Sequence, residues 1–244
     1  RYPHAAADEL EHISFRVECG QTLAIIGATG SGKTTLAGLI PRFYDATQGT
    51  VLVDGVDVRD YTFDALYDRL GYVTQKAVLF SGTVQDNIFF GQSEAADTDE
   101  TLQQALQLSQ AAEFVDRYPE KAAHPIAQLG RNVSGGQKQR LSIARALARR
   151  PEILIFDDSF SALDYKTDAT LREGLAKQLP GTTKIIVAQR ISTIRHADQI
   201  LVLDRGEIAG LGTHDALMAS CPVYREIAMS QLSEEELKKG GASK

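Results

Sequence analysis

The chain has 244 residues, with 26 basic against 32 acidic side chains, a formal net charge of −6 at pH 7 and two cysteines. This length suits one large α/β domain with a full core, and the acidic balance gives no electrostatic support for nucleic-acid binding. Cys19 and Cys221 are too few for a disulfide framework or a thiolate metal site, so we expect reduced thiols. No apolar run approaches the length of a membrane span, and no signal-peptide pattern opens the sequence.

The first long apolar segment predicts a strand that leads into a glycine-rich loop. Residues 10–26 begin with alternation at Ile13, Phe15 and Val17, which is typical of a half-exposed antiparallel strand, and then become continuously apolar. From Gly27 to Thr34 the sequence reads GATGSGKT, which matches G-x-x-x-x-G-K-[ST] at every fixed position. Residues 35–40 predict the helix that follows this loop.

This loop predicts the binding of a nucleoside triphosphate. Its glycines let backbone N–H groups surround the phosphates, the Lys33 amine reaches the β- and γ-phosphates, and the Thr34 hydroxyl suits Mg²⁺. The residues expected to contact the nucleotide here are Gly27, Thr29, Gly30, Ser31, Gly32, Lys33, Thr34 and Thr35. The alternative is a glycine-rich turn that carries a lysine without such a role.

Farther along the chain, a short antiparallel element precedes a mainly helical region. Residues 50–55 predict a strand that ends in the turn Asp54-Gly55. The pattern from about 84 to 150 is helical, and Asp97 with Glu100 resembles a helix-capping arrangement.

A second glycine-rich segment opens a helix at residue 134. Ser134, Gly135, Gly136 and Gln137 offer a hydroxyl group, unhindered backbone N–H groups and the positive end of a helix dipole, which predicts a second anion site. The alternative is a helix N-cap followed by flexible glycines. The basic run at 138–150 predicts a solvated helix face with contacts between lobes rather than a nucleic-acid site.

The remaining apolar runs predict core strands at 153–156, 184–188 and 200–203, with a turn at 204–206 that leads into 207–209. Asp157 directly follows the first of these buried runs, where a carboxylate without a partner is costly, so a metal-binding role is favoured.

Together these elements predict an α/β protein, a P-loop NTPase with a parallel-sheet core, an antiparallel β subdomain and an inserted α-helical subdomain. We expect one nucleotide-binding domain over residues 1–232, with the helical lobe inserted at about 84–150. Residues 233–244 are charged, small and glycine-bearing, which predicts a disordered tail.

The ordered motifs resemble those of one family. The P-loop, Gln75 in Val73-Thr74-Gln75, the Ser134–Gln137 signature, the strand ending in Asp157-Asp158, and Ser161 to Asp164 follow in the order found in the nucleotide-binding domain of ATP-binding cassette (ABC) transporters. The resemblance covers nearly the whole chain, and residues 79–88 resemble the exporter branch. It implies an ABC ATPase that couples hydrolysis of ATP, bound with Mg²⁺, to transport.

The resemblance also implies roles for particular residues in a head-to-tail dimer, where each ATP lies between one P-loop and the signature helix of the other chain. Tyr2 would stack on adenine, and Thr34 with Asp157 would hold Mg²⁺. Gln75 would sense the metal and the attacking water and relay movement to the membrane domain. The alternatives are a terminal surface aromatic for Tyr2 and a solvated loop amide for Gln75. Asp164 would be a dimer-interface contact or a helix cap.

Two residues depart from the family pattern near the γ-phosphate. Hydrolytically competent members carry a catalytic glutamate where this chain has Asp158, whose carboxylate is withdrawn by about 1.5 Å. A misplacement of about 1 Å can cost on the order of 100-fold in rate. Gln189 stands where the family has a histidine; it donates a hydrogen bond but carries no positive charge.

This combination resembles the impaired half of a heterodimeric bacterial multidrug ABC exporter. The resemblance implies low ATPase activity of the isolated chain and a signature that completes the site of a different subunit. It also implies attachment at the cytoplasmic face of the cell membrane through transmembrane domains absent from this chain. Two alternatives stay open: a homodimeric exporter ATPase in which aspartate suffices, and a regulatory nucleotide-binding module that does not hydrolyse ATP.

Overall fold

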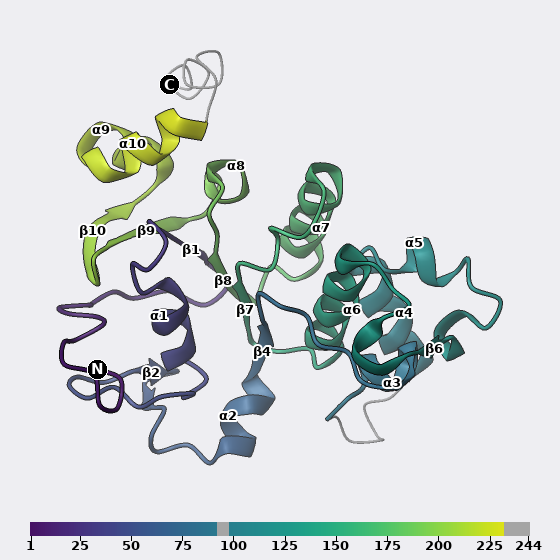
Figure 1. The fold of residues 1–244 in the computed structure, drawn as a ribbon. Helices are drawn as coiled ribbons and strands as arrows, with labels where there is room; N and C mark the ends of the chain where they lie inside the picture. Colours follow the sequence, from purple (N-terminus) through teal and green to yellow (C-terminus); the bar gives the residue numbers. More distant parts are fainter. Residues whose placement is uncertain (92–97, 232–244) are drawn as a thin grey trace. The chain divides into compact units, whose positions relative to one another are not determined.

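The computed structural model describes residues 1–91 and 98–231, so the predicted tail at 233–244 lies outside the described residues. The chain divides into two units, one formed by residues 1–67 with 183–244 and the other by residues 68–182. Figure 1 shows the helices and strands of both units, coloured along the sequence from purple at the N-terminus to yellow near the C-terminus.

Four strands form the sheet of the first unit. They are β1 (Thr22–Ile26), β8 (Thr183–Val187), β9 (Gln199–Asp204) and β10 (Glu207–Gly212), in the order β10-β9-β1-β8. β1 is parallel to both of its neighbours, whereas β10 returns antiparallel beside β9 with a register shift between Ile208 and Gly210. The predicted parallel core is thereby confirmed for β1, β8 and β9, and β10 adds an antiparallel edge to it.

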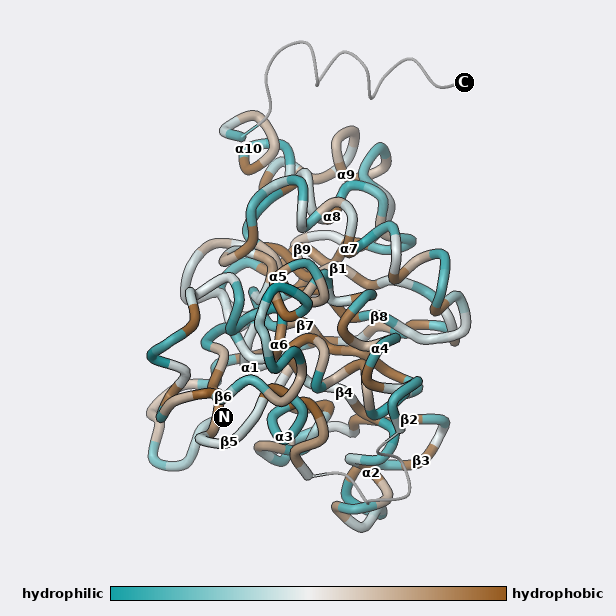
Figure 2. Tube along the Cα trace, turned by 90° about the vertical axis from the view of Figure 1, so that its right-hand side faces the viewer, coloured by the Kyte–Doolittle hydropathy of each residue, from teal (hydrophilic) through white to brown (hydrophobic). Residues whose placement is uncertain are grey.

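The central strands of this unit are buried on both faces. Leu23 to Ile26 on β1 and Ile200 to Leu203 on β9 are at most 1% exposed. Figure 2 shows β1 and β9 mainly in brown, the hydrophobic end of the scale. This continuous burial explains why their sequences are unbroken apolar runs rather than alternating ones.

The helix and hairpin after β1 match the predicted elements. Helix α1 spans Lys33–Leu39, and the two short strands β2 (Leu52–Val53) and β3 (Val56–Asp57) form an antiparallel hairpin. Asp54 and Gly55 at its turn have φ of 50° and 79°, as a type I′ turn requires. Helix α2 (Phe63–Arg69) follows.

The antiparallel strand predicted at the start of residues 10–26 is wrong. The first strand begins at Thr22, and residues 13–18 carry no strand pairing. The alternation is still visible in the burial, since Ile13, Phe15 and Val17 are half-buried while the residues between them are exposed. The three apolar side chains of this segment therefore face the protein interior although the segment has no hydrogen-bonded partner strand.

Three helices complete the first unit: α8 (Ile191–Ile194), α9 (His214–Ser220) and α10 (Pro222–Gln231). The Thr213 hydroxyl caps α9 by accepting from the Ala216 N–H. Tyr224 on α10 is fully buried, and its hydroxyl lies 2.8 Å from His214 Nδ1, which joins α10 to α9.

In the second unit, two parallel strands carry the helices. β4 (Leu70–Val73) pairs with β7 (Ile153–Asp157) in a register that sets Tyr72 opposite Ile155 and Val73 opposite Phe156. Helix α6 (Gly135–Ala148) precedes β7, and α7 (Tyr165–Gln178) follows it.

The helical region between β4 and α6 consists of short elements. They are β5 (Gly82–Thr83), α3 (Val84–Ile88), α4 (Asp99–Leu108), α5 (Ala112–Val115), η2 (Lys121–Ala123), β6 (Pro125–Ile126) and η3 (Gln128–Gly130). Asp97, predicted in a cap, lies outside the described residues, and the N-cap of α4 is Thr98, whose hydroxyl accepts from the Thr101 N–H.

No helix among residues 1–91 and 98–231 combines the length and apolar character needed to cross a bilayer. The longest of the described helices, α6 and α7, have 14 residues each.

The burial of β1 predicts which truncations destabilise the fold. Leu23→Ala should lower the free energy of unfolding by about 2–5 kcal/mol, because Leu23 is 0% exposed in the core of the sheet. Leu52→Ala on β2 is the matched control, since Leu52 is 58% exposed and its truncation should cost less than about 1 kcal/mol. Urea unfolding followed by circular dichroism measures both, and equal losses would contradict the assigned core.

Candidate functional site

The loop after β1 has the backbone that its glycines predict. Gly30 and Gly32 have φ of 79° and 95°, a region that side-chain-bearing residues rarely adopt. A Cβ at Gly27 would lie 2.0 Å from the Leu203 carbonyl oxygen, so only glycine lets the loop pass this close to β9. A Cβ at Gly30 would meet nothing within 4 Å, so the loop is open on that side.

The start of α1 suits an anion. Gly32 is its N-cap and has no side chain that could accept from the N–H groups of the first turn. The Lys33 ammonium lies over the loop and donates to the carbonyl oxygens of Gly27 at 2.9 Å and Ala28 at 2.7 Å. Thr34 is exposed, whereas Ser31 is buried beneath the loop.

Tyr2 lies beside this loop although it stands far from it in the sequence. Its hydroxyl is 2.9 Å from Thr35 Oγ1 on α1, and its ring meets Tyr44 edge-to-face with centroids 4.9 Å apart. Tyr2 is half-buried.

Gln189, in the same unit, is the second residue after β8; it is exposed and is contacted by helix α10. The Gln231 amide donates to the Gln189 carbonyl at 2.7 Å and accepts from the Ile191 N–H at 2.9 Å. Gln231 therefore fixes the backbone on both sides of Arg190, a role for which no local sequence pattern exists.

The second unit carries the two acids at the end of β7. Asp157 and Asp158 are 4% and 7% exposed. The Tyr72 hydroxyl donates to Asp157 Oδ2 at 3.1 Å, and the Gln75 amide donates to Asp158 Oδ2 at 2.9 Å. Each buried carboxylate thus has a donor that comes from β4 or from the residues directly after it.

Tyr72 is a site residue that the sequence analysis did not predict. Burial raises the pKa of its phenol well above the ordinary value, and the neighbouring Asp157 carboxylate raises this pKa further. The hydroxyl therefore keeps its proton at neutral pH and remains a donor to Asp157.

Asp158 has a left-handed backbone, with φ of 48°. Aspartate is among the residues that tolerate this region, and its carbonyl accepts a 2.7 Å bond from the Ser161 hydroxyl. The turn after β7 is thus fixed by hydrogen bonding, and Gln75 fixes the carboxylate.

The signature segment begins α6 with a capping box. Ser134 Oγ accepts from the Gln137 N–H at 3.3 Å, and Gln137 Oε1 accepts from the Ser134 N–H at 2.8 Å. The predicted N-cap alternative is therefore real, yet the Ser134 hydroxyl proton is not used in it and can be donated to an anion. A Cβ at Gly135 would meet nothing within 4 Å, so no contact with the described residues of the chain requires a glycine there.

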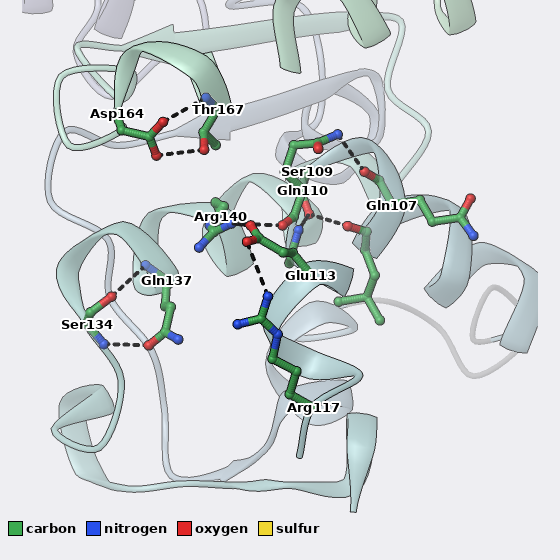
Figure 3. A network of polar contacts seen from close by, with 12 residues as sticks. Gln107, Ser109, Gln110, Glu113, Arg117, Ser134, Gln137, Arg140, Asp164 and Thr167 are labelled. Atoms are coloured by element: carbon green, nitrogen blue, oxygen red, sulfur yellow. Dashed lines mark hydrogen bonds and ion pairs between the residues drawn. The ribbon is translucent and has the colours of Figure 1, made fainter. Parts of the chain in front are cut away.

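A network of charges anchors the same helix (Figure 3). The Arg140 guanidinium donates to Glu113 Oε2 at 2.9 Å and to the Gln110 carbonyl at 3.0 Å, and it lies 4.9 Å from the Phe114 ring centroid. Arg117 forms a second, longer ion pair with Glu113 at 3.6 Å. Arg140, from the basic run, thus makes a contact between helices.

Comparison with known proteins decides the family. Residues 10–161 match the family described as ABC transporter. The chain belongs to the ABC transporter family.

The chain spans about two fifths of the length of the relatives described next. It is 48% identical over 231 residues to an uncharacterized ABC transporter ATP-binding protein of Mycobacterium tuberculosis, covering 94% of this chain and 39% of that protein. It is 42% identical to an ATP-dependent lipid A-core flippase of Albidiferax ferrireducens, covering 95% of this chain and 40% of that protein. A solved bacterial Atm1-family ABC exporter with ATP bound superposes with a TM-score of 0.90 at 36% identity, covering 96% of this chain and 41% of the other.

The predicted site residues of this ABC domain form separate groups within its two units. Tyr2 and Thr35 lie together beside the P-loop, and Gln189 belongs to the same unit. Gln75 meets Asp158 in the other unit, which also carries the signature helix. Sequence patterns did not reveal Tyr72 and Gln231, because their contacts span 85 and 42 residues.

Asp164, predicted as an interface contact or a helix cap, is the N-cap of α7. It accepts from the Thr167 N–H at 3.0 Å and from the Thr167 hydroxyl at 2.7 Å. These bonds lower the pKa of the Asp164 carboxyl, because they favour its charged form.

The bond between Tyr72 and Asp157 can be tested by a double-mutant cycle. Tyr72→Phe should lower the free energy of unfolding by about 1–2 kcal/mol, because the buried Asp157 carboxylate loses a donor. In an Asp157→Ala background the same change should cost less than about 0.5 kcal/mol. Equal costs in both backgrounds, measured by urea unfolding, would show that the phenol acts elsewhere.

Proposed function

We propose that the chain is the ATP-binding domain of a membrane ABC exporter. MgATP is bound and hydrolysed at the interface between this domain and a second nucleotide-binding domain. This binding and hydrolysis are coupled to the export of a substrate. Its own site is impaired, and its signature completes the site of a different subunit. The names of its relatives support the exporter class, since they include a lipid A-core flippase and a putative multidrug export ATP-binding/permease protein of Bacillus subtilis.

The P-loop and Tyr2 hold the nucleotide in this proposal. The left-handed glycines, the uncapped first turn of α1 and the Lys33 ammonium supply donors and positive charge to the β- and γ-phosphates. Tyr2 is positioned by Thr35 to stack on the adenine ring, with Tyr44 packed against it edge-to-face.

The residues available for Mg²⁺ fit its chemistry. Thr34 offers a hydroxyl oxygen and Asp157 a carboxylate, and hard oxygen ligands of this kind are those that Mg²⁺ prefers. The ion, when bound, neutralises charge on the β- and γ-phosphate oxygens. Tyr72 holds the Asp157 carboxylate. Gln75, which donates to Asp158, would sense the metal and the attacking water.

The observation that carries the proposed impairment is the bond between Gln75 and Asp158. The short Asp158 side chain is held at 2.9 Å by the Gln75 amide and starts from a left-handed backbone, so its reach toward an attacking water is limited. Gln189 offers a hydrogen bond but no positive charge to the transition state. The site therefore binds MgATP well and hydrolyses it slowly.

The signature helix supports a role toward another subunit. Gly135 is exposed at the start of α6, and a Cβ added there would meet no atom within 4 Å, although glycine costs about 1 kcal/mol relative to alanine in a helix. A close approach by the phosphates of a partner's ATP explains why glycine stands there. The Ser134 hydroxyl and the backbone N–H group of Gly136 then supply the donors.

The transmembrane domains of the transporter are the other proposed partners. They would attach the domain at the cytoplasmic face of the cell membrane and choose the substrate. The chain spans 39–40% of the relatives described above, so these partners rest on the resemblance alone.

The impairment can be tested by restoring the missing groups. Asp158→Glu with Gln189→His should raise the ATP turnover of the purified chain by about 100-fold. The glutamate carboxylate extends about 1.5 Å farther toward the attacking water, and the histidine supplies a cationic group near the γ-phosphate. MgATP affinity, measured by isothermal titration calorimetry, should change little. Lys33→Ala in the same background is the control, and it should abolish binding.

The same measurement separates the alternatives. Fast turnover of the unaltered chain, equal at two equivalent sites, would support the homodimeric ATPase and remove the proposed asymmetry. If Ser134→Arg in this chain leaves the rate of ATP hydrolysis by a partner domain unchanged, the regulatory module would be supported instead.

The proposed role of Gly135 predicts that a methyl group at this position lowers activity without lowering stability. Gly135→Ala should leave the thermal stability of the chain unchanged or slightly higher, because the added methyl group meets no neighbour in it. The variant should lower the ATPase activity of the assembled transporter by at least about tenfold, since the methyl group obstructs the phosphates. Gly181→Ala, another exposed glycine whose Cβ meets nothing, is the control and should leave the activity intact.

A further inference from the structure

Three side chains with metal-binding groups meet on the surface of the first unit. A carboxylate oxygen of Glu11, an imidazole nitrogen of His12 and a carboxylate oxygen of Glu207 all lie within 4.8 Å of one another. All three residues are exposed. Glu207 is far from the other two in the sequence, so no local sequence motif predicts this cluster.

The fold brings these side chains together by a close backbone contact. The Glu11 N–H donates to the Gly206 carbonyl at 2.9 Å, directly before Glu207 opens β10. Gly206 has φ of 84°, and a Cβ there would lie 2.5 Å from the Glu9 carbonyl oxygen. The segment around Glu9 is therefore fixed against the β9–β10 turn, and the cluster does not depend on a chance meeting of mobile loops.

The charges of the cluster are uncompensated within the described part of the chain. Over residues 1–91 and 98–231, the side chains of Glu11, His12 and Glu207 take part in no ion pair and in no hydrogen bond. Two carboxylates this close repel each other, and the imidazole beside them offers a lone pair when neutral. A divalent cation would relieve the repulsion and use all three groups.

We propose that Glu11, His12 and Glu207 bind one divalent transition-metal ion, for which Zn²⁺ is the best match. The imidazole distinguishes this set from the all-oxygen sites that Ca²⁺ and Mg²⁺ prefer. Two carboxylates and one imidazole are ligands that Zn²⁺ accepts in a four-coordinate site, with water in the fourth position. Ligand atoms on a tetrahedral zinc ion lie about 3.4 Å apart, so exposed side chains need only small rotations to close from 4.8 Å.

The bound ion would clamp the N-terminal segment to the β9–β10 hairpin. This segment also reaches the P-loop, since a Cβ added at Gly32 would lie 2.7 Å from Leu10 Cδ2. Binding to the folded state alone raises its stability, so zinc at about ten times its dissociation constant should raise the melting temperature by about 3–5 °C.

The test uses the nucleotide-free 244-residue chain, stripped with EDTA and desalted, with Cys19→Ser to remove the exposed thiol. Isothermal titration with ZnCl₂ should show one equivalent bound per chain, and Ca²⁺ at the same concentration should bind more weakly. His12→Asn keeps a residue that tolerates the left-handed φ of 54°, and Glu207→Gln keeps the side-chain shape. Each should weaken zinc binding by at least about tenfold and remove the rise in melting temperature.

His4→Asn is the matched control, because His4 is another exposed histidine with a left-handed φ, of 65°, outside the cluster. It should leave zinc binding unchanged. Circular dichroism of each variant without zinc checks that the fold is intact. The proposal is overturned if zinc binds equally well to His12→Asn and Glu207→Gln, or if millimolar zinc gives neither binding heat nor a rise in melting temperature.

Discussion

The burial of two adjacent carboxylates at the end of β7 is the constraint on which the second unit depends. Asp157 and Asp158 are 4% and 7% exposed, and neighbouring negative charges in such a place are unfavourable unless each has a donor. The parallel pairing of β4 with β7 supplies both donors, because the carboxyl ends of the two strands lie at the same edge of the sheet. Tyr72 lies near the end of β4, and Gln75 follows that strand. A shift of one residue in this register would turn Tyr72 to the other face and leave Asp157 without its phenol.

The two acids are held in different ways by their donors. Asp157 is held by a phenol whose raised pKa keeps it protonated, which suits a fixed carboxylate that helps to bind a cation. Asp158 is held by an amide and rises from a left-handed turn, which suits a group that is kept in place rather than aimed at a water molecule. In the proposed function, the first arrangement preserves affinity for MgATP, and the second limits the chemical step.

The signature helix is stabilised within the chain in a way that leaves its start available. The capping box uses the Ser134 oxygen as an acceptor and the Gln137 side chain as a partner for a backbone N–H, and the Arg140–Glu113 pair fixes the helix farther along. None of these contacts uses the Ser134 hydroxyl proton or the space beside Gly135. A rigid helix with an open first turn is what the binding of an anion from outside the chain requires.

The sequence by itself determined the features that depend on neighbours along the chain. The P-loop between strand and helix, the Asp54-Gly55 turn, the buried strands and the Ser134 cap all follow from short patterns, because backbone conformation and capping act within a few residues. The predicted strand at the start of residues 10–26 was wrong, because alternation reports which face is buried but not whether a partner strand is paired with it. Only the tertiary structure brought Tyr72 to Asp157, Gln231 to Gln189 and Glu207 to Glu11 and His12. Each of these contacts is set by strand register or by the docking of distant segments, and sequence spacing carries no information about such distances in space.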